Sequence, residues 1–330
     1  MMMENPAIKF LIIRFSSIGD IVLTTPVIRM IKNQIQNAEV HYLTKPQFLP
    51  ILEANPYLSK IHFLQDDFKA MIEELKSEDF YYVIDLHHNI RSENVKRQLR
   101  LPAFNVNKIN WEKWLRVWLK IDRLPRRHIV DRYLDTLTVF DVVNDQQGLD
   151  YFIPEQAQIM ADDLPVKDYV LMVIGGQHET KKMPAGKLAE LCTLLPFPVI
   201  LAGGREDVAT AESIIALSLN SAVINACGNY SINQSASLVQ QARLVITHDT
   251  GLMHVAAAFH KKIISIWGNT IPEFGMYPYL ADKESVQVEV KGLSCRPCSK
   301  IGYPKCPKKH FNCMQQQDIQ AIADAAGRLW

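Results

Sequence analysis

Strand-like and helix-like segments alternate along both halves of this 330-residue chain, and this order constrains the fold more than any other feature. Apolar runs typical of buried strands lie at 8–13, 39–43, 60–63 and 81–85 in the first half, and at 169–174, 199–202, 244–247 and 263–267 in the second. Helical patterns, such as 20–35, lie between them. The alternation predicts an α/β fold with two doubly wound, Rossmann-like parallel sheets, each covered by helices on both faces.

A domain boundary is predicted from a polar stretch at 144–148, which Pro154 and Pro165 follow. We therefore expect a first domain at 1–160, a second at 161–314 and an amphipathic helix at 315–330. Ligands of open α/β sheets bind beyond the carboxyl ends of the strands. The two domains are accordingly expected to face a central cleft.

Composition argues against several classes of protein. The net charge is +1, which gives no general attraction to nucleic acid. The apolar run at 10–13 is shorter than a secretory signal or a membrane-spanning helix, which need roughly 7–15 and about 20 apolar residues. Six cysteines in a chain of this length do not make a disulfide framework. We expect a cytoplasmic protein.

The segment 248–254 (HDTGLMH) lies where a strand pattern ends and a helix pattern begins. Thr250 and Gly251 can present backbone amides there, and the helix dipole favours a phosphate. Asp249 repels a bare phosphate but suits a ligand with both phosphate and hydroxyl groups, such as a nucleotide-sugar. The alternative is an ordinary helix start, with Asp249 as its N-cap.

Three more charged residues follow predicted strands. Asp20 stands at the first strand-to-helix turn, where a carboxylate serves either as general base for a sugar hydroxyl or as an ordinary helix-start residue. Lys181, shortly before Pro184, can hold a diphosphate as a point charge or lie in a solvated turn. Asp207 can bind ribose hydroxyls or begin a helix.

Residues 91–132 form a basic region, with 12 Lys or Arg and 4 Asp or Glu, a local net charge of +8. Within it, Trp111, Trp114 and Trp118 follow helical spacing beside Lys113, Arg116 and Lys120. Tryptophans with cations suit a membrane surface that carries acidic lipid headgroups. The alternative is a core helix whose tryptophans pack inward.

Four cysteines cluster near the C-terminus, at Cys295, Cys298, Cys306 and Cys313. Their thiolates could bind a structural zinc ion that orders the loop. The spacing is not that of a paired Cys-x₂-Cys zinc knuckle, so a structural or redox-labile loop without metal is the favoured interpretation.

The strand-end motifs together resemble glycosyltransferase family 9, which includes the bacterial ADP-heptose:lipopolysaccharide heptosyltransferases. The resemblance covers about residues 8 to 315 and rests on RFSSIGDIVLTTP, a KxxP turn, GGxxD and DTGxxHxAAA. It implies a GT-B fold with an N-terminal acceptor domain, a C-terminal donor domain and a last helix that crosses back to the first domain. It also implies inverting, metal-independent transfer of a sugar from a nucleotide-activated donor, with ADP-heptose and a lipopolysaccharide core or related lipid-linked glycan as the family's best-known pair.

Residue roles follow from the same resemblance, motif by motif. Asp20 matches the general base, and Lys181 matches the lysine that binds the diphosphate. The loop that binds the sugar and the phosphate is matched by Asp249, Thr250 and Gly251. Asp207 matches the residue that binds ribose, and Tyr230 matches the segment that lies against adenine. His254 matches a family histidine to which we assign no role. We add Asn89 and Arg91, at another strand end, as acceptor-binding candidates, and the basic tryptophan-rich patch as a contact with the inner face of the cytoplasmic membrane.

Two departures from the family pattern bear on the donor. Met183 stands where heptosyltransferases often carry tryptophan, and Gly175-Gly176 stand where some members carry hydroxyl residues. Two other functions stay open at this point. A nicotinamide-dependent oxidoreductase fits the paired Rossmann-like halves but lacks GxGxxG after any predicted strand, and a non-catalytic nucleotide-sugar sensor would have no need of a base at Asp20.

Overall fold

The computed structural model describes residues 6–330 and divides them into two compact units. The N-terminal unit comprises the chain up to Lys108 together with Ile129–Phe152, and the C-terminal unit comprises Ile109–His128 and Ile153–Trp330. The chain thus passes from one unit to the other three times. The sequence suggested one passage between residues 160 and 161 and a last helix, at 315–330, that returns to the first domain. In particular, the tryptophan-rich segment belongs to the C-terminal unit rather than the first one.

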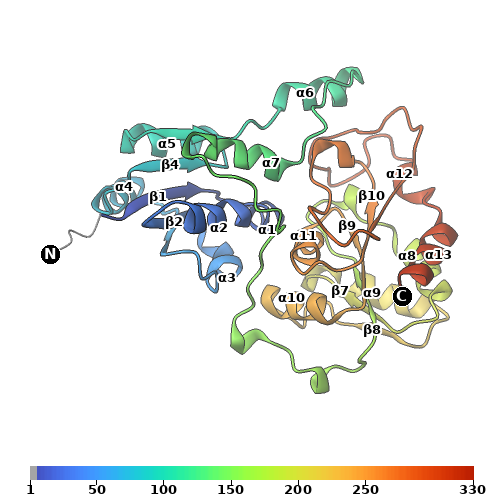
Figure 1. Cartoon of the computed structure of the whole chain (residues 1–330). Coiled ribbons are helices and arrows are strands. Elements are labelled where there is room, and N and C mark those ends of the chain that lie inside the picture. Colours follow the sequence, from blue (N-terminus) through green and yellow to red (C-terminus); the bar gives the residue numbers. More distant parts are fainter. Residues whose placement is uncertain (1–5) are drawn as a thin grey trace. The chain divides into compact units, whose positions relative to one another are not determined.

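The N-terminal unit is built on a five-stranded parallel sheet of order β3-β2-β1-β4-β5 (Figure 1). Its strands are β1 (Ile8–Ile13), β2 (Ala38–Thr44), β3 (Lys60–Phe63), β4 (Tyr82–Asp85) and β5 (Ala103–Asn105). Its α-helices are α1 (Ile18–Val22), α2 (Thr25–Gln34), α3 (Leu49–Leu52), α4 (Phe68–Ser77), α5 (Ile90–Leu99) and α7 (Ile129–Leu134). The central strand β1 pairs with β2 from Ile8↔Ala38 and with β4 from Phe10↔Tyr82.

Alternation of side chains along β1 explains how this sheet is covered on both faces. Leu11 and Ile13 are fully buried and belong to a core that α4 and α5 complete, with Met71, Leu75 and Val95 among its members. Successive residues of a strand point to opposite faces. Phe10 accordingly lies on the other face, where its ring contacts those of Tyr82 and Phe140. A strand segment that is buried on both faces is expected to be apolar, and the buried part of β1, residues 10–13, is apolar throughout.

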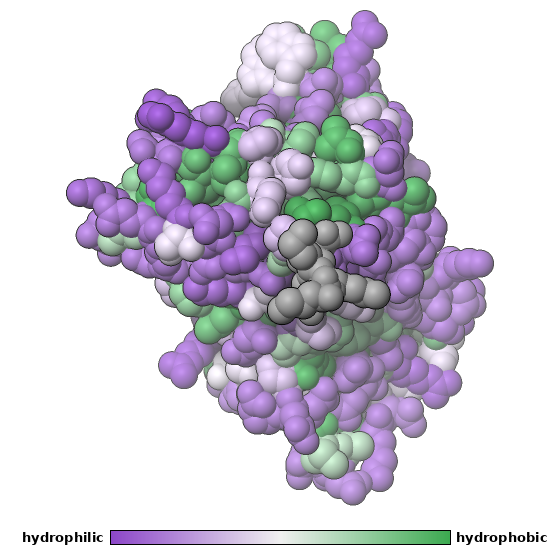
Figure 2. Space-filling view, turned by 60° about the vertical axis from the view of Figure 1, so that its left-hand side comes forward, coloured by the Kyte–Doolittle hydropathy of each residue, from purple (hydrophilic) through white to green (hydrophobic). Residues whose placement is uncertain are grey.

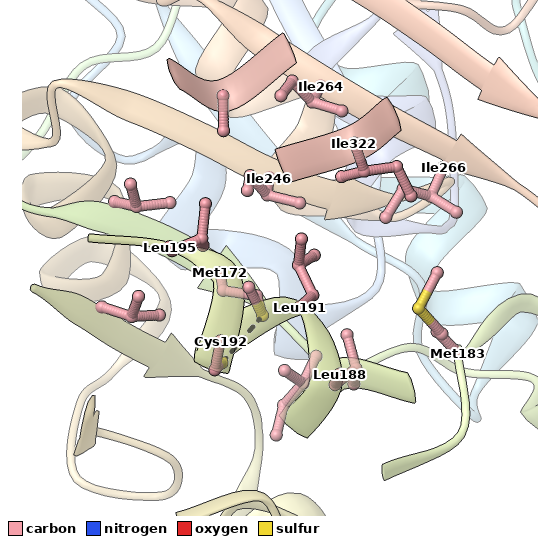
Figure 3. Packing of buried hydrophobic residues seen from close by; sticks show 14 of the residues in the cluster. Met172, Met183, Leu188, Leu191, Cys192, Leu195, Ile246, Ile264, Ile266 and Ile322 are labelled. Carbon is pink, nitrogen blue, oxygen red and sulfur yellow. Dashed lines mark hydrogen bonds between the residues drawn. The ribbon is translucent and has the colours of Figure 1, made fainter. Parts of the chain in front are cut away.

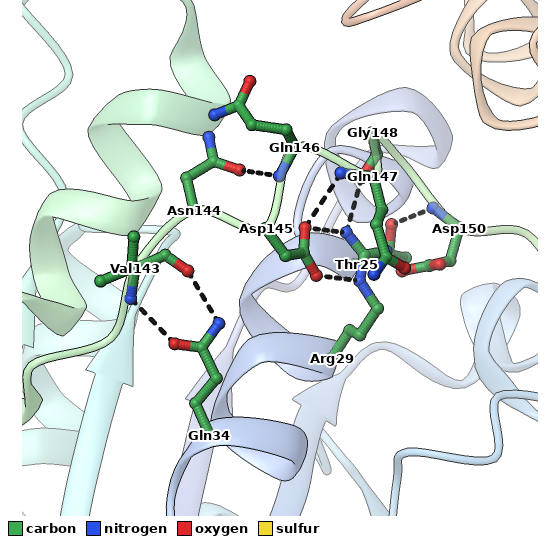
Figure 4. Close-up of polar contacts among 10 residues, drawn as sticks. All are labelled: Thr25, Arg29, Gln34, Val143, Asn144, Asp145, Gln146, Gln147, Gly148 and Asp150. Carbon is green, nitrogen blue, oxygen red and sulfur yellow. Dashed lines mark hydrogen bonds and ion pairs between the residues drawn. The ribbon is translucent and has the colours of Figure 1, made fainter.

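The polar stretch after residue 142 is fixed to α2 by a network around Arg29 (Figure 4). The buried guanidinium group donates to both carboxylate oxygens of Asp145 at 2.8 and 2.9 Å, to the Gly148 carbonyl at 2.9 Å and to Asp150. Gln34 adds a two-way amide contact with the Val143 backbone. The sequence suggested a domain boundary here, and these contacts fix the stretch within the N-terminal unit, which the chain leaves after Phe152.

The C-terminal unit is built on a six-stranded parallel sheet of order β11-β10-β9-β6-β7-β8. Its strands are β6 (Val170–Val173), β7 (Val199–Ala202), β8 (Val223–Asn225), β9 (Leu244–His248), β10 (Ile263–Trp267) and β11 (Val286–Glu289). Its α-helices are α6 (Asn110–Trp114), α8 (Ala185–Leu194), α9 (Val208–Leu217), α10 (Ile232–Gln241), α11 (Gly251–Ala258), α12 (Asn312–Gln315) and α13 (Ile319–Leu329). Figure 1 shows α10 and α11 on one side of this sheet and α8 and α13 on the other.

One large apolar core joins this sheet to α8, α9 and α13 (Figure 3). Ile246 and Ile266 from the sheet, Leu191 from α8 and Ile322 from α13 are each at most 1% exposed. The last helix therefore packs within the C-terminal unit, against α8 and β10, where the sequence suggested that it crosses back to the first domain. Its strongly amphipathic pattern is explained by this core, which Ile319, Ala326 and Leu329 also enter.

The two doubly wound parallel sheets confirm the predicted α/β class. None of the helices in residues 6–330 combines the length and the apolar character that a membrane-spanning helix needs. Hydrophilic side chains predominate on the face drawn in Figure 2.

Candidate active site

Asp20 lies in the first turn of α1, directly beyond the carboxyl end of β1. Its carboxylate accepts hydrogen bonds from the backbone N–H of Ser17 at 3.2 Å and from the Ser17 hydroxyl at 2.9 Å. The Arg14 guanidinium forms an ion pair with it, Nη2 to Oδ1, at 2.8 Å. Asp20 thus serves as a helix-start residue, and with a side chain 23% exposed it also remains accessible to a substrate.

Arg14 is held on several sides, and this fixes the charge beside Asp20. It donates to the carbonyls of Ser16 and Leu86, each at 2.7 Å, and to the Tyr133 hydroxyl at 3.2 Å. Burial opposes ionisation of Asp20, but the Arg14 charge and the Ser17 hydrogen bonds outweigh it and lower the pKa of Asp20 to about 2. The carboxylate is therefore ionised at neutral pH and is a weak base.

A hollow of about 1260 Å³ lies beyond the ends of β2, β3 and β4 in the same unit. Asn89 and Arg91, the two acceptor-binding candidates, both line it. Asn89 caps α5, since its side chain accepts from the Ser92 N–H at 2.9 Å. Lys45 adds a second cation, and the other lining residues include the amides Gln47 and Gln65 and the aromatic rings Phe63 and Phe68.

In the C-terminal unit, Asp249 follows β9 and forms an ion pair with Lys181, Nζ to Oδ2, at 2.7 Å. Lys181 ends the short 3₁₀ turn η6 (Glu179–Lys181), which comes from a different part of the chain. The Thr270 hydroxyl donates to the same carboxylate oxygen at 2.9 Å. Four residues predicted to bind the donor are thus adjacent, because Thr250 and Gly251, the N-cap and first residue of α11, come directly after Asp249.

The start of α11 has the features of an anion site. Gly251 is its first residue, and Thr250 stands at the N-cap in an extended conformation. The Thr250 hydroxyl does not cap the helix and lies 3.2 Å from the Thr247 hydroxyl instead. First-turn N–H groups of a helix lack intrahelical partners and favour an anion. His254, one turn further on, is 2% exposed and lies within the packed helix.

Asp207 has a different environment from the one predicted for a ribose ligand. Its side chain is 2% exposed, accepts from the Gly204 N–H at 3.0 Å and pairs with Lys182 at 3.3 Å. A Cβ on Gly175 or Gly203 would come within 2.6 to 2.8 Å of the Asp207 side chain. The two glycines therefore allow Asp207 to sit between two strand ends, where it begins the turn into α9.

The loop that carries Lys181 is fixed at both ends. The buried His248 ring accepts from the Met183 N–H at 3.0 Å, and burial lowers the pKa of His248 to about 4, which keeps the ring neutral as an acceptor. Thr180 exchanges two hydrogen bonds with Tyr303, at 3.1 and 2.8 Å. Tyr230 is half-buried directly before α10, whose N-cap is Ser231.

The tryptophan-rich segment exposes its large rings. Trp111 and Trp118 are each 64% exposed and Trp114 is 39% exposed, while Val117 is buried with Phe274 in a small separate core. The rings of Trp111 and Trp114 stack on each other with centroids 5.2 Å apart. The alternative of inward-packed tryptophans is therefore wrong, because the aliphatic residues of this segment make its core contacts.

The four clustered cysteines give no support to the zinc site that the sequence left open as the less favoured interpretation. Among residues 6–330, no three of Cys295, Cys298, Cys306 and Cys313 bring their sulfur atoms within 4.8 Å of one another. Cys313 is buried in the main core, and burial raises the pKa of its thiol to about 12, so it stays protonated. The loop instead lies beside the donor-site candidates through the Tyr303–Thr180 contact.

Comparisons with known proteins agree with this geometry. Residues 68–307, more than half of the chain, match the model of glycosyltransferase family 9 (heptosyltransferase). Lipopolysaccharide heptosyltransferase 1 of Campylobacter coli is 26% identical over 295 residues, which are 79% of this chain and 84% of the relative.

Solved structures show the same fold. The structure of E. coli ADP-heptose lps heptosyltransferase II superimposes with a TM-score of 0.75 at 18% identity, covering 98% of each chain. E. coli heptosyltransferase WaaC with ADP-2-deoxy-2-fluoro heptose has a TM-score of 0.69 at 18% identity, over 97% of this chain and 99% of that one. The predicted GT-B architecture is confirmed by these neighbours.

Sequence reasoning assigned no role to Arg14, Thr270 or His248, which position Asp20, Asp249 and the Lys181 loop. Arg14 lies within the RFSSIGD motif and could have been suspected from it. Thr270 lies far from Asp249 in the sequence, and no local pattern links the two. His248 adjoins Asp249, but its contact with Met183 depends on a loop from another part of the chain.

Proposed function

The chain belongs to glycosyltransferase family 9 and is a glycosyltransferase, and from this premise we propose that it moves a heptose from ADP-heptose onto a lipopolysaccharide core or a related lipid-linked glycan. The observation that carries the proposal is the Lys181–Asp249 pair beside the start of α11. A cation, a carboxylate and free helical N–H groups together suit the diphosphate and the hydroxyls of a nucleotide-sugar. The E. coli structure with a bound ADP-heptose analogue supports the choice of donor.

The proposed reaction is a single displacement with inversion. An acceptor hydroxyl attacks the anomeric carbon, its proton passes to Asp20, and the bond to the ADP oxygen breaks with its electron pair leaving on ADP. Because the pKa of Asp20 is about 2, the proton moves only once the new C–O bond has made the hydroxyl strongly acidic. Lys181 and the amides of Thr250 and Gly251 stabilise the charge that develops on the leaving phosphate, without a divalent ion.

Three other residues complete the proposed donor site. Tyr230 is half-buried at the start of α10, where its ring is available to stack on adenine. Asp207 would act on the ribose only indirectly in its present conformation, since its carboxylate already holds Gly204 and Lys182. His254 acts through the packing of α11 rather than by contact, because it is 2% exposed.

The acceptor is proposed to bind in the hollow of the N-terminal unit. Arg91 and Lys45 supply charge for phosphorylated or acidic sugar residues, and Asn89, Gln47 and Gln65 supply amides for hydroxyl groups. Phe63 and Phe68 offer rings that pack against sugar faces. This mixture of cations, amides and rings suits a charged oligosaccharide better than a purely apolar ligand.

We also propose that the protein works at the inner face of the cytoplasmic membrane, as a peripheral protein. Trp111, Trp114 and Trp118 are exposed next to Lys113 and Arg116, and such a surface binds an interface of anionic lipids. A lipid-linked acceptor is presented at that interface, so the contact would bring enzyme and acceptor together.

The test is a transfer assay on the full chain. ADP-heptose and a lipopolysaccharide acceptor that lacks the added heptose should give a product heavier by one heptose, with turnover unchanged by EDTA. In a parallel thermal-shift panel, ADP should stabilise the protein more than UDP or GDP, by roughly 2.7 kcal/mol at 100 times its Kd. Transfer from a UDP-sugar but not from ADP-heptose would contradict the proposed donor.

A further inference from the structure

Two histidine rings and a glutamate meet on the N-terminal unit, and none of the three lines the hollow. Their ligand atoms, from His41, His62 and Glu78, lie within 4.8 Å of one another. The sheet register explains the meeting: His41 pairs with Lys60, so His62, two residues later on β3, points to the same face. Glu78 follows directly at the C-terminal end of α4.

The two rings present nitrogen atoms to each other, with His41 Nδ1 3.0 Å from His62 Nε2. Two lone pairs cannot face each other at this distance, so a proton or a metal cation must lie between the nitrogens. In a tetrahedral zinc site with bonds of about 2.0–2.1 Å, two ligand nitrogens are separated by about 3.3 Å. Glu78 Oε2 lies 3.9 Å from His41 Nδ1, within a small side-chain rotation of a third ligand position.

The outer nitrogen of His62 contacts a carboxylate at hydrogen-bond distance, and that of His41 has one nearby at a longer distance. His62 Nδ1 lies 2.9 Å from Glu74 Oε1, and His41 Nε2 lies 3.8 Å from Glu39 Oε2. Histidines that ligate a metal almost always donate their other ring N–H to a carboxylate, a backbone carbonyl or a water, which fixes the tautomer and raises the basicity of the ligating nitrogen. The Phe80 ring packs edge-on against both histidines and holds their orientation.

We propose that His41, His62 and Glu78 form a structural site for a first-row divalent transition metal of the zinc class, with water as the fourth ligand. Both histidines are at most 3% exposed, so a bound cation would be shielded from solvent on their side. The metal would join β2, β3 and the end of α4. Glu74 also accepts from Gln65 at 2.9 Å, so the site would brace the rim of the hollow that Gln65 lines.

Two lysines compete for the third ligand. Lys60 pairs with one oxygen of Glu78, and Lys9 lies 3.7 Å from the other. Metal binding must displace at least part of the ion pairing between Glu78 and these lysines, so the affinity for the metal should be modest. Removing Lys60 therefore tests whether Glu78 is a ligand. Lys60→Met frees Glu78 and should tighten metal binding several-fold if Glu78 is a ligand, whereas it should have no effect if Glu78 is not.

The experiment is a Co²⁺ titration of the full chain followed by visible absorption, with Zn²⁺ thermal shifts in parallel. One equivalent of Co²⁺ should give the d–d bands of a tetrahedral site without a thiolate charge-transfer band, and the same result should appear in a Cys295→Ser/Cys298→Ser background. Glu78→Gln and His62→Asn should abolish the bands, and Glu74→Gln should weaken binding about 10–100-fold. Glu73→Gln, an exposed change on the same helix, is the matched control and should bind like the parent.

Loss of the signal in the cysteine variant, with the histidine variant unchanged, would place the metal elsewhere and overturn the proposal. Absence of binding at millimolar Co²⁺ would mean that the nitrogens share only a proton. If His62→Asn does not fold, the other two variants still test the metal site. Glu78→Gln should weaken metal binding and Lys60→Met should tighten it. None of these measurements depends on the transfer reaction, so the proposed metal site can be contradicted without affecting the proposed function.

Discussion

The two units carry carboxylates at equivalent places, Asp20 after β1 and Asp249 after β9, but they hold them in different ways. Asp20 is paired with an arginine from the end of its own strand, and that guanidinium is itself fixed by Ser16, Leu86 and Tyr133. Asp249 is paired with Lys181, a flexible side chain from another loop, and with Thr270. The first arrangement is rigid, and the second contains a cation that can turn toward another anion.

The difference fits two tasks. A carboxylate that receives a proton needs a constant position and a constant charge, which a planar, multiply bonded arginine provides. A lysine is a compact charge on four rotatable carbons, so it can leave one carboxylate for a diphosphate at small cost. If the Arg14–Asp20 pair (the rigid site) governs chemistry and the Lys181–Asp249 pair (the flexible site) governs the donor, substitutions at the two sites should have different kinetic effects.

Asp20→Asn should have the largest effect. It removes the proton acceptor while keeping the shape of the turn, so kcat should fall by roughly 10²–10⁴ with ADP binding unchanged. Transfer kinetics and an ADP titration of the same preparation measure the two quantities. Asp79→Asn, an exposed change in the same unit, is the control and should retain full activity. Wild-type turnover in Asp20→Asn would remove the general base from the proposal.

Lys181→Met should lower kcat by about 10²–10³, because the leaving phosphate loses its cation in the transition state. Lys182→Met is the informative partner, since Lys182 faces the buried carboxylate of Asp207 instead. That variant should lose about 3–5 kcal/mol of stability through the unpaired charge. Kinetics at matched folded fraction and denaturant unfolding separate the two effects. Equal kinetic losses in both variants would show that Lys181 has no special relation to the donor.

The stability of the protein in acid should depend on the ion pair between Arg14 and Asp20. The pKa of Asp20 falls from 3.8 to about 2 on folding, so the ionised form stabilises the fold above pH about 4, and this contribution is lost as pH falls through about 2. The size is about 2 kcal/mol. Free energies of unfolding measured for the parent and for Asp20→Asn should converge by that amount between pH 5 and pH 2. Parallel pH profiles would mean that Arg14 does not hold the carboxylate.

The fold was predictable from sequence because the central strands are apolar on both faces. β1, β7 and β10 have the predicted bounds, since each is a short, largely buried run. The edge strand β3 also has the predicted bounds, although only one of its four residues is buried. The other edge strands, β5, β8 and β11, were missed; each has only three or four residues and is partly exposed, so its apolar signal is weak. The helix predicted at 20–35 is two helices, α1 and α2, with Pro26 at the start of the second.

The sequence predicted the contacts of a site residue only where the residue and its hydrogen-bond partners lie in the same motif. Asp20 and Ser17 lie three residues apart, so the turn that joins them is local. Asp249 and Lys181 were each found from their own motifs, but their ion pair brings together two loops that follow different strands. The exposure of Trp111 depends on which apolar neighbours fill the core, and Val117 rather than a tryptophan does so.

Thr270→Val should have the smallest effect and bears on the flexible site alone. The change keeps the volume of the side chain and removes the hydroxyl that donates to Asp249 at 2.9 Å. One hydrogen bond is worth about 1 kcal/mol, so the KM for the donor should rise about fivefold with kcat little changed. Thr136→Val, a buried threonine of the N-terminal unit whose hydroxyl donates to the Tyr133 carbonyl, is the control and should leave that KM unaltered. If Thr270→Val lowers kcat as strongly as Lys181→Met does, Asp249 takes part in the chemical step, and the division between a rigid catalytic carboxylate and a flexible donor-binding one fails.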